Sequence, residues 1–127
     1  MLKKKVLPKD VYGSWIMLLQ GTRDELNGYL WRQLKHEPDA SREQIGPAAR
    51  AHTTEYTPSG RVPIYYIAVV QGKSRDRFDL LAALGHECLH VVLSVLEFRG
   101  VKITTDNDEP VTYYFEWLFR LCAREVW

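Results

Sequence analysis

The chain has 127 residues, of which 46% are hydrophobic and 12% aromatic, and its formal net charge is +1. This length suits one domain with a single core that needs no covalent or metal staple, so residues 1–127 are expected to form one domain. The apolar content excludes a disordered tail as the main class. The balanced charge gives no indication of a nucleic-acid partner.

The amino-terminal segment carries a basic cluster at residues 3–5, Lys-Lys-Lys. A run this short is more often a solvated end of the chain than a binding site for anions. It has the charge of a secretory leader, but Pro8, Lys9 and Asp10 interrupt the apolar stretch that a leader needs next, and no small-residue cleavage site is present. No run approaches a membrane span, so a cytoplasmic protein without a membrane partner is expected.

A strand and a helix are expected in residues 11–34. The segment 11–19 has the aromatic and aliphatic content of a strand, and Gly21 ends it. Thr22 is a preferred N-cap residue, and Glu25 stands three residues later at the capping-box position. The helix 22–34 has a core face of helical spacing, formed by Leu26, Tyr29, Leu30, Trp31 and Leu34.

The next segment is expected to be a loop followed by two strands. Residues 36–47 are rich in charged residues, Pro and Ser, which favours a loop. Residues 51–57 and 62–70 are expected to be strands of a hairpin, joined at Pro58-Ser59-Gly60. The second of these strands is strongly β-forming and is expected to be central in the sheet.

The most informative stretch is His86-Glu87-Cys88-Leu89-His90, which lies in a helix expected over residues 76–99. Residues i and i+4 stack one turn apart on a helix, so both imidazoles can reach one metal ion. Glu87 lies about 100° round the helix and can address a water on that metal without being a ligand. Chance would produce this pattern in roughly one such sequence in a hundred.

The remainder of this helix leaves the histidines on a narrow polar stripe. On a helical wheel, His86, His90 and Glu97 fall within about 40° of one another. The opposite arc is expected to be core, and it contains Leu80, Leu81, Leu84, Cys88, Val91, Val92, Val95 and Phe98. Cys88 points roughly 200° from His86 and is excluded as a ligand. Gly85 is unfavourable inside a helix, which indicates either close approach of another backbone or tight packing there.

A second helix is expected to run to about Glu125, after a helix C-cap at Gly100 and an extended stretch at residues 101–105. Asp108 or Glu109 can cap it, and Pro110 suits its first turn. One face of this helix, within about 60° on the wheel, carries Glu109, Tyr113, Glu116 and Arg120. That face either contributes to a metal site or is a solvated face with an ion pair between Glu116 and Arg120. The opposite side, with Cys122, is expected to be core.

The predicted order is strand, helix, strand, strand, histidine helix, helix. This order indicates an α+β fold in which a small, mostly antiparallel sheet packs on the histidine helix and the C-terminal helix. The two cysteines, Cys88 and Cys122, lie on apolar helix faces, where a free thiol packs as a small hydrophobic side chain. A reducing cytoplasm is the simplest setting for them.

The stretch 81–117 resembles the core of the gluzincin metallopeptidases, members of the zincin superfamily, in which His-Glu-x-x-His precedes a glutamate ligand at the start of another helix. It is also similar to small phage-encoded metallopeptidases that pair such a helix with an Asn-x-Glu-Pro/Ala-x-x-Tyr helix; here Asn107-Asp108-Glu109 stands at that place. The resemblance implies a minimal zincin-like domain with Zn²⁺ as cofactor. It implies His86, His90 and Glu109 as zinc ligands and Glu87 as the catalytic base. Glu116, two turns further along the same helix face, is the main rival to Glu109 as the third ligand.

The chain departs from the thermolysin-like branch four residues after Glu109, where Tyr113 replaces an aspartate that supports a histidine ligand. A supporting hydrogen-bond acceptor is therefore expected from Glu116, Asp106 or Asp108. The catalytic stabiliser of the developing oxyanion is expected to be Tyr113, with Arg120 and His52 as alternatives. Leu96 stands where metzincins carry a third histidine, which argues against that family.

The function expected from the resemblance is zinc-dependent hydrolysis of a peptide bond in a peptide or protein substrate, as in a metalloendopeptidase. In zincins an edge strand above the metal binds substrate as an added strand. The hairpin 51–70 is expected there. His52 and Tyr56 could reach the cleft or could occupy exposed strand positions. A phage-encoded protein of this kind would act in the cytoplasm of the host cell.

Two alternatives belong to other functional classes. One is a catalytically inactive zinc-binding phage protein with a role in assembly or in binding a host protein. The other is a structural protein whose histidine stripe is accidental. Measured zinc content separates the structural protein, which binds none, from the enzyme and the inactive zinc protein. The effect of Glu87→Gln on activity then separates the enzyme from the inactive zinc protein.

Overall fold

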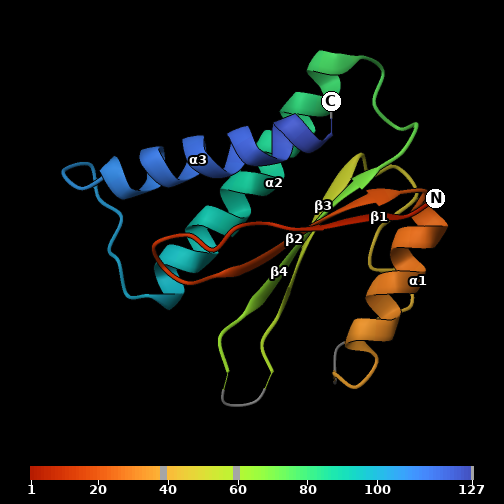
Figure 1. Ribbon diagram of the computed structural model, residues 1–127, viewed down its shortest axis with the longest axis horizontal. Coiled ribbons are helices and arrows are strands. Elements are labelled where there is room, and N and C mark those ends of the chain that lie inside the picture. The colour runs from red at the N-terminus through yellow and green to blue at the C-terminus, as the bar shows by residue number, and fades with distance from the viewer. Residues whose placement is uncertain (38–39, 59–60, 127) are drawn as a thin grey trace.

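The computed structural model describes residues 1–37, 40–58 and 61–126, which form a sheet with helices on both faces (Figure 1). Its strands are β1 (Lys3–Val6), β2 (Trp15–Gly21), β3 (Ala51–Tyr56) and β4 (Ile64–Val70). Its helices are α1 (Arg23–Leu34), α2 (Arg77–Phe98) and α3 (Glu109–Glu125). Figure 1 shows α1 on one side of the sheet and both α2 and α3 on the other. The α+β class expected from the sequence is confirmed.

The sheet has four strands in the order β1-β2-β4-β3, and its pairing is mixed. The outer pairs, β1–β2 and β3–β4, are antiparallel, while the central pair β2–β4 is parallel, with Met17 opposite Tyr66. The sequence predicted a mostly antiparallel sheet, and this prediction is wrong for the central pair, which is parallel. The chain leaves β2 through α1 and β3, and it returns in β4 alongside β2 in the same direction.

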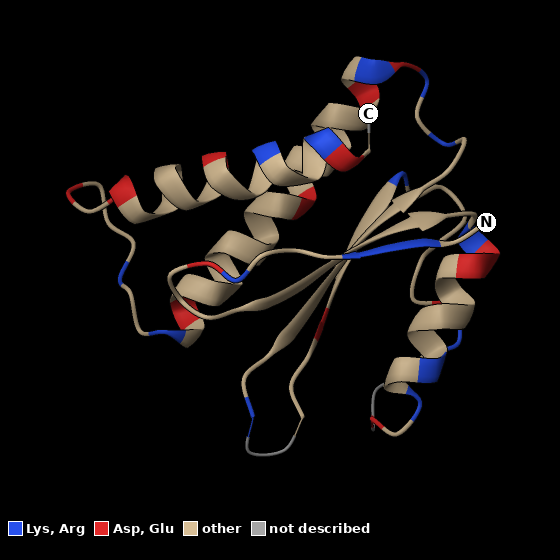
Figure 2. Cartoon of the chain, in the orientation of Figure 1, with Lys and Arg blue, Asp and Glu red and all other residues tan. Residues whose placement is uncertain are grey.

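The basic cluster at residues 3–5 is not merely a solvated end, because it forms the edge strand β1, drawn in blue in Figure 2. All four side chains of this strand are exposed, while its backbone pairs with β2, with Lys3 opposite Gln20 and Val6 opposite Met17. Lysines on an edge strand discourage pairing with another chain. The sequence shows the solvation of these side chains but not the pairing of their backbone.

The strand expected at 11–19 starts later, at Trp15, because a tight turn precedes it. The Asp10 carboxylate accepts hydrogen bonds from the backbone N–H groups of Tyr12 (2.8 Å) and Ser14 (3.1 Å). Gly13 has a φ of +69°, in the left-handed region that favours glycine. An aspartate that binds backbone N–H groups two and four residues ahead stabilises a turn at the expense of a strand.

Two hydrophobic cores lie on the two faces of the sheet. Alternate residues of β4 divide between them, with Tyr65, Ile67 and Val69 towards α2 and α3. Their neighbours in the strand face α1; they are Tyr66, Ala68 and Val70. A strand buried on both faces is continuously apolar, and this confirms the expected central position of residues 64–70. Residues 59–60 of the predicted turn lie outside the described part.

Helix α1 begins with the predicted capping box. The Thr22 hydroxyl accepts a hydrogen bond from the Glu25 N–H (3.2 Å), and the Glu25 carboxylate accepts one from the Thr22 N–H (2.9 Å). The predicted loop after α1 is held by Asn27, whose side chain makes two hydrogen bonds to the backbone of the fully buried Ile45.

Helix α2 buries the predicted apolar arc except at its last residue. Phe98 was expected in the core but is 48% exposed, and Leu96, which was not expected there, is fully buried. Gly100 ends the helix with a φ of +73°. Its N–H bonds the Glu97 carbonyl (3.0 Å), and the Val101 N–H bonds the Leu96 carbonyl (2.9 Å). These two bonds form a Schellman motif, which confirms the predicted C-cap. Residues 101–105 form no strand in the described structure.

The expectation that no run approaches a membrane span is wrong by length and composition, because α2 is long and apolar enough to suit one. One side of the helix, with Leu84, Val91 and Val95, packs in the core with the sheet and with Leu118 and Cys122 of α3. Four large apolar side chains of α2 lie outside this core and are exposed: Phe78, Leu89, Leu93 and Phe98. The core helix of a folded domain and a membrane span share this composition.

Gly85 lies where α3 packs on α2. A Cβ at this position would be 3.6 Å from a ring carbon of Phe119 and 3.8 Å from one of Phe115. The neighbour is therefore a pair of stacked aromatic side chains on α3, not another backbone. At these distances a methyl group makes ordinary van der Waals contact, so neither a close backbone nor tight packing requires glycine at this position.

Substituting Gly85→Ala should raise the free energy of unfolding by about 0.5–1 kcal/mol, because alanine favours the helix and its methyl group fits against Phe119. The matched control Gly100→Ala should lower it by about 1 kcal/mol, because alanine is strained at a φ of +73°. Urea denaturation measures both. A destabilised Gly85→Ala variant would show that the two helices pack more tightly here than described.

Candidate metal centre

His86 and His90 lie side by side on the exposed face of α2. Their Nε2 atoms are 3.1 Å apart, and the ring centroids are 4.8 Å apart with an interplanar angle of 75°. One ring nitrogen can donate a hydrogen bond to the other, or both can direct lone pairs at one metal ion. The helix thus places the two predicted ligands side by side, with the Nε2 atom of one ring facing the Nε2 atom of the other.

The separation of these nitrogens fits a zinc ion. Zinc binds imidazole nitrogen at about 2.0–2.1 Å and prefers tetrahedral geometry, so two ligand nitrogens are expected ~3.3 Å apart. The observed 3.1 Å lies close to this distance. Both histidines are exposed, which leaves room for water or substrate on the outer side of such an ion.

The Glu87 side chain reaches the edge strand β3 and lines the same hollow as His86. Its carboxylate Oε2 accepts a hydrogen bond of 2.7 Å from the Thr53 hydroxyl, which also lies 3.2 Å from the Glu87 carbonyl oxygen. Glu87 is half-buried, so this contact holds the carboxylate in place beside the helix. Sequence reasoning missed Thr53; its only signal is a polar β-branched residue in a short strand of a predicted hairpin.

β3 is an edge strand of the sheet and contacts α2. The sequence predicted that the hairpin would supply an edge strand beside the histidine helix. Thr53 pairs with Ile67, whose side chain belongs to the α2 face, so alternation puts His52 and Tyr56 on the other face. Tyr56 packs against the core under α1, and the expectation that it reaches the cleft is wrong. Burial lowers the pKa of His52, although the nearby Glu87 carboxylate acts in the opposite direction.

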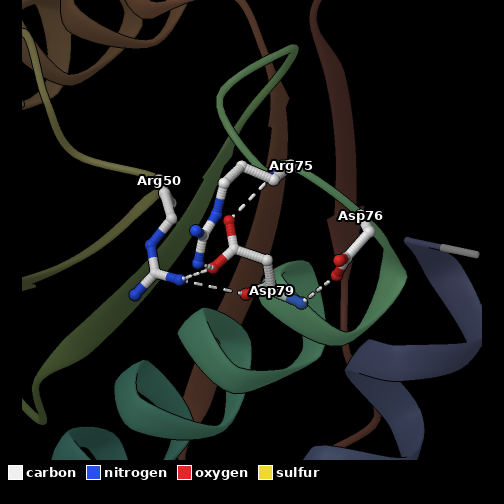
Figure 3. A network of polar contacts seen from close by, with 4 residues as sticks. All are labelled: Arg50, Arg75, Asp76 and Asp79. Carbon is white, nitrogen blue, oxygen red and sulfur yellow. Dashed lines mark hydrogen bonds and ion pairs between the residues drawn. The ribbon is translucent and has the colours of Figure 1, made fainter.

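A polar network joins the start of β3 to the start of α2 (Figure 3). The Arg50 guanidinium, from the residue before β3, forms an ion pair with the Asp79 carboxylate in the first turn of α2. Asp79 also accepts a hydrogen bond from the Arg75 N–H (2.9 Å), and its own N–H donates to the N-cap residue Asp76 (2.8 Å). The Arg75 N–H and the Arg50 charge lower the pKa of Asp79.

The network closes one end of a small hollow beside the candidate ligands. This hollow has a volume of about 280 Å³ and is lined by Arg50, His86, Glu87 and four alanines, Ala48, Ala49, Ala51 and Ala83. Small side chains on its walls keep the space open next to the histidine and the carboxylate. Of the two residues predicted to be catalytic, Glu87 and Tyr113, this hollow adjoins Glu87.

The predicted third ligand lies elsewhere. Glu109 stands at the start of α3, where it lines a different hollow together with Tyr113, which is 69% exposed. Within residues 1–37, 40–58 and 61–126, no set of three His, Cys, Asp or Glu side chains is placed to hold a metal ion. The roles assigned to Glu109 and Tyr113 therefore stay predictions.

The other candidate residues of α3 and the loop before it face solvent. Glu116 forms an exposed ion pair of 2.8 Å with Arg120 one turn on, as the solvated-face interpretation expects. Asp106 and Asp108 are exposed. In the described part of the chain, no hydrogen bond links Glu116, Asp106 or Asp108 to either histidine.

Cys88 and Cys122 are free, fully buried thiols on the facing sides of α2 and α3. A hydrogen bond between them, together with burial, raises the pKa of Cys88 well above its usual range. The neutral thiol is a poor zinc ligand, which agrees with the exclusion of Cys88 from the metal site.

Comparison of the chain with protein-family models, with curated proteins and with solved structures found no match. The functional assignment consequently depends on the residues of α2 and β3 themselves. Their arrangement consists of two converging imidazoles, an adjacent carboxylate bound to an edge strand, and a small hollow beside them.

The contact between Thr53 and Glu87 should contribute about 1 kcal/mol to stability. In a double-mutant cycle, Thr53→Val and Glu87→Ala should show a coupling of about this size, because valine keeps the β-branched shape but has no donor. Thr53→Val combined with Glu97→Ala, an exposed residue further along α2, serves as the control and should be additive. Additivity in the first cycle would show that the hydroxyl does not hold the carboxylate.

Proposed function

We propose that the protein is a zinc-dependent metallopeptidase of zincin-like design, in which His86 and His90 bind the metal and Glu87 is the general base. The observation that carries this proposal is the 3.1 Å approach of the two Nε2 atoms on an exposed helix face, one residue from Glu87. The helix supplies the spacing and the exposure that such a site needs. A peptide or protein is the substrate class.

Zinc bound here would lower the pKa of its water towards about 7 and polarise the carbonyl of the scissile bond. Glu87 would accept the proton of the attacking water and return it to the leaving amine. The Thr53 hydroxyl binds Oε2 of Glu87, while Oε1 has no hydrogen-bond partner among the described residues and is left to accept the proton. Thr53 thus acts as a positioning residue for the base.

The edge strand supports a mode of substrate binding. β3 is the last strand of the sheet, so its outer backbone edge pairs with no other strand of the described structure. An extended peptide can add to such an edge as a further strand. The hollow beside His86 and Glu87 is small and lined with alanines, which favours a small side chain next to the scissile bond.

Replacing Glu87 with Gln should abolish hydrolysis of an unfolded protein substrate while leaving one zinc per chain, because Glu87 is the base and not a ligand. His86→Ala and His90→Ala should lose the zinc. Hydrolysis is followed with a fluorescently labelled, unfolded protein, and zinc by elemental analysis. Loss of zinc from Glu87→Gln as severe as that from His86→Ala would contradict the role given to Glu87.

The third protein ligand is proposed to be Glu109, on the resemblance to gluzincins. Glu109→Ala should then weaken zinc binding by about tenfold or more, whereas Glu116→Ala should change it less than twofold, because Glu116 is paired with Arg120. The two residues lie about 10 Å apart along the helix, too far to bind one ion together. Competition with a chelating dye measures both affinities. The reverse ranking would move the ligand to Glu116.

A zinc-binding protein without catalysis, phage-encoded and used in assembly or in binding a host protein, is the second candidate. This candidate keeps the converging His86 and His90 as zinc ligands but gives Glu87 no role in catalysis. The two candidates separate in wild-type protein loaded with zinc. Hydrolysis that Glu87→Gln abolishes supports the enzyme, and stoichiometric zinc with no hydrolysis supports the binding protein.

A further inference from the structure

A second, larger hollow lies between the turn at residues 9–12 and the amino-terminal half of α3. Its volume is about 660 Å³. One wall is a ridge on α3 formed by Pro110, Tyr113 and Trp117, and the opposite wall is formed by Val11 and Tyr12. Residues three to four apart stand above one another on a helix, so the three side chains of α3 form a continuous row.

The aromatic rings at the base of this hollow are packed together. Tyr114 is buried, with its ring centroid 5.3 Å from that of Tyr12 and 5.9 Å from that of Trp117. These separations are typical of favourable aromatic pairs. The floor of the hollow is therefore a rigid apolar surface that does not depend on a ligand.

Hydrogen bonds hold the two walls in fixed positions. The Tyr114 hydroxyl donates to the Asp10 carboxylate, which also accepts from the N–H groups of Tyr12 and Ser14. The Arg99 guanidinium donates to the Tyr12 carbonyl (2.6 Å). The turn at residues 9–12 is thus tied both to α3 and to the end of α2, which preforms the hollow.

The rim of the hollow carries two exposed side chains and two free donors. Val11 is 94% exposed and Tyr113 is 69% exposed, while the half-buried Trp117 packs on the core. Within residues 1–37, 40–58 and 61–126, neither the Tyr113 hydroxyl nor the Trp117 indole N–H has a hydrogen-bond partner. Aromatic rings with free donors on a preformed apolar surface are typical of binding sites.

The charge at one end of the hollow is negative. Glu109 lines the hollow, and Asp106 and Asp108 precede it in the loop that leads into α3; all three are exposed. Figure 2 shows acidic positions, in red, in the loop before α3 and at the amino end of this helix. None of them forms an ion pair in the described residues. The one lysine of the lining, Lys9, lies over the Trp15 ring, 4.4 Å from its centroid.

We propose that this hollow binds a proline-rich segment of a partner protein in polyproline II conformation, with a basic residue of the segment at the acidic end. Proline rings fit between rows of aromatic side chains, and a polyproline II helix has no internal hydrogen bonds. Its free carbonyls match the unpaired donors of Tyr113 and Trp117. Exposed Asp106, Asp108 and Glu109 attract the basic residue by charge. This inference needs neither zinc nor hydrolysis, and it gives Glu109 and Tyr113 a role other than those of zinc ligand and oxyanion stabiliser in the proposed enzyme.

The test uses the full chain, without added metal, and a synthetic ten-residue peptide of prolines ending in two arginines. Binding is measured by calorimetry and by the shift of the Trp117 indole N–H in nitrogen-15 NMR spectra. Tyr113→Ala should weaken binding about tenfold, as expected when an aromatic contact is lost. Phe78→Ala, a matched control that removes an aromatic side chain 80% exposed and outside the hollow, should change it less than twofold.

Two altered peptides test the chemistry of the ligand. Replacing every proline by glycine should abolish measurable binding, because the extended helix is then no longer preformed. Replacing the two arginines by glutamates should weaken binding at least tenfold. The proposal is overturned if the proline peptide does not bind, if the glycine peptide binds equally well, or if Tyr113→Ala and Phe78→Ala have the same effect.

Discussion

The burial of one side of α2 is the constraint on which the rest of the structure depends. Val91, Val92, Val95 and their neighbours are fully or almost fully buried between the sheet and α3. This packing fixes the rotation of the helix about its axis, so the stripe with His86 and His90 must face outwards. The same rotation directs Glu87 at Thr53 of the edge strand. Core packing and site geometry are therefore consequences of one apolar arc.

The sequence predicted the parts of the fold that depend on local periodicity and capping. The three helices, the capping box at Thr22, the C-cap at Gly100 and the central strand 64–70 all follow from patterns within a few residues. The histidine pair follows in the same way, because i and i+4 spacing on a helix is a local property. These are the features for which neighbouring residues alone decide the structure.

The features that were missed depend on contacts between distant segments. The strand β1 forms because its backbone pairs with β2, although its lysines give only the signal of a solvated end. Thr53 reaches Glu87 through the register of β3 on β4, which no local pattern shows. Glu109 lies at the predicted helix start, yet helical position alone did not reveal that it lines a separate aromatic hollow.

The central claim is that the Nε2 atoms of His86 and His90 bind one zinc ion. A crystal structure of the zinc-loaded protein, with anomalous data collected at the zinc edge, tests it most directly. The claim requires an anomalous peak about 2.0–2.1 Å from both nitrogens, with Glu87 beyond ligand distance. Zinc bound elsewhere, or a histidine pair that stays hydrogen-bonded at saturating zinc, would contradict it.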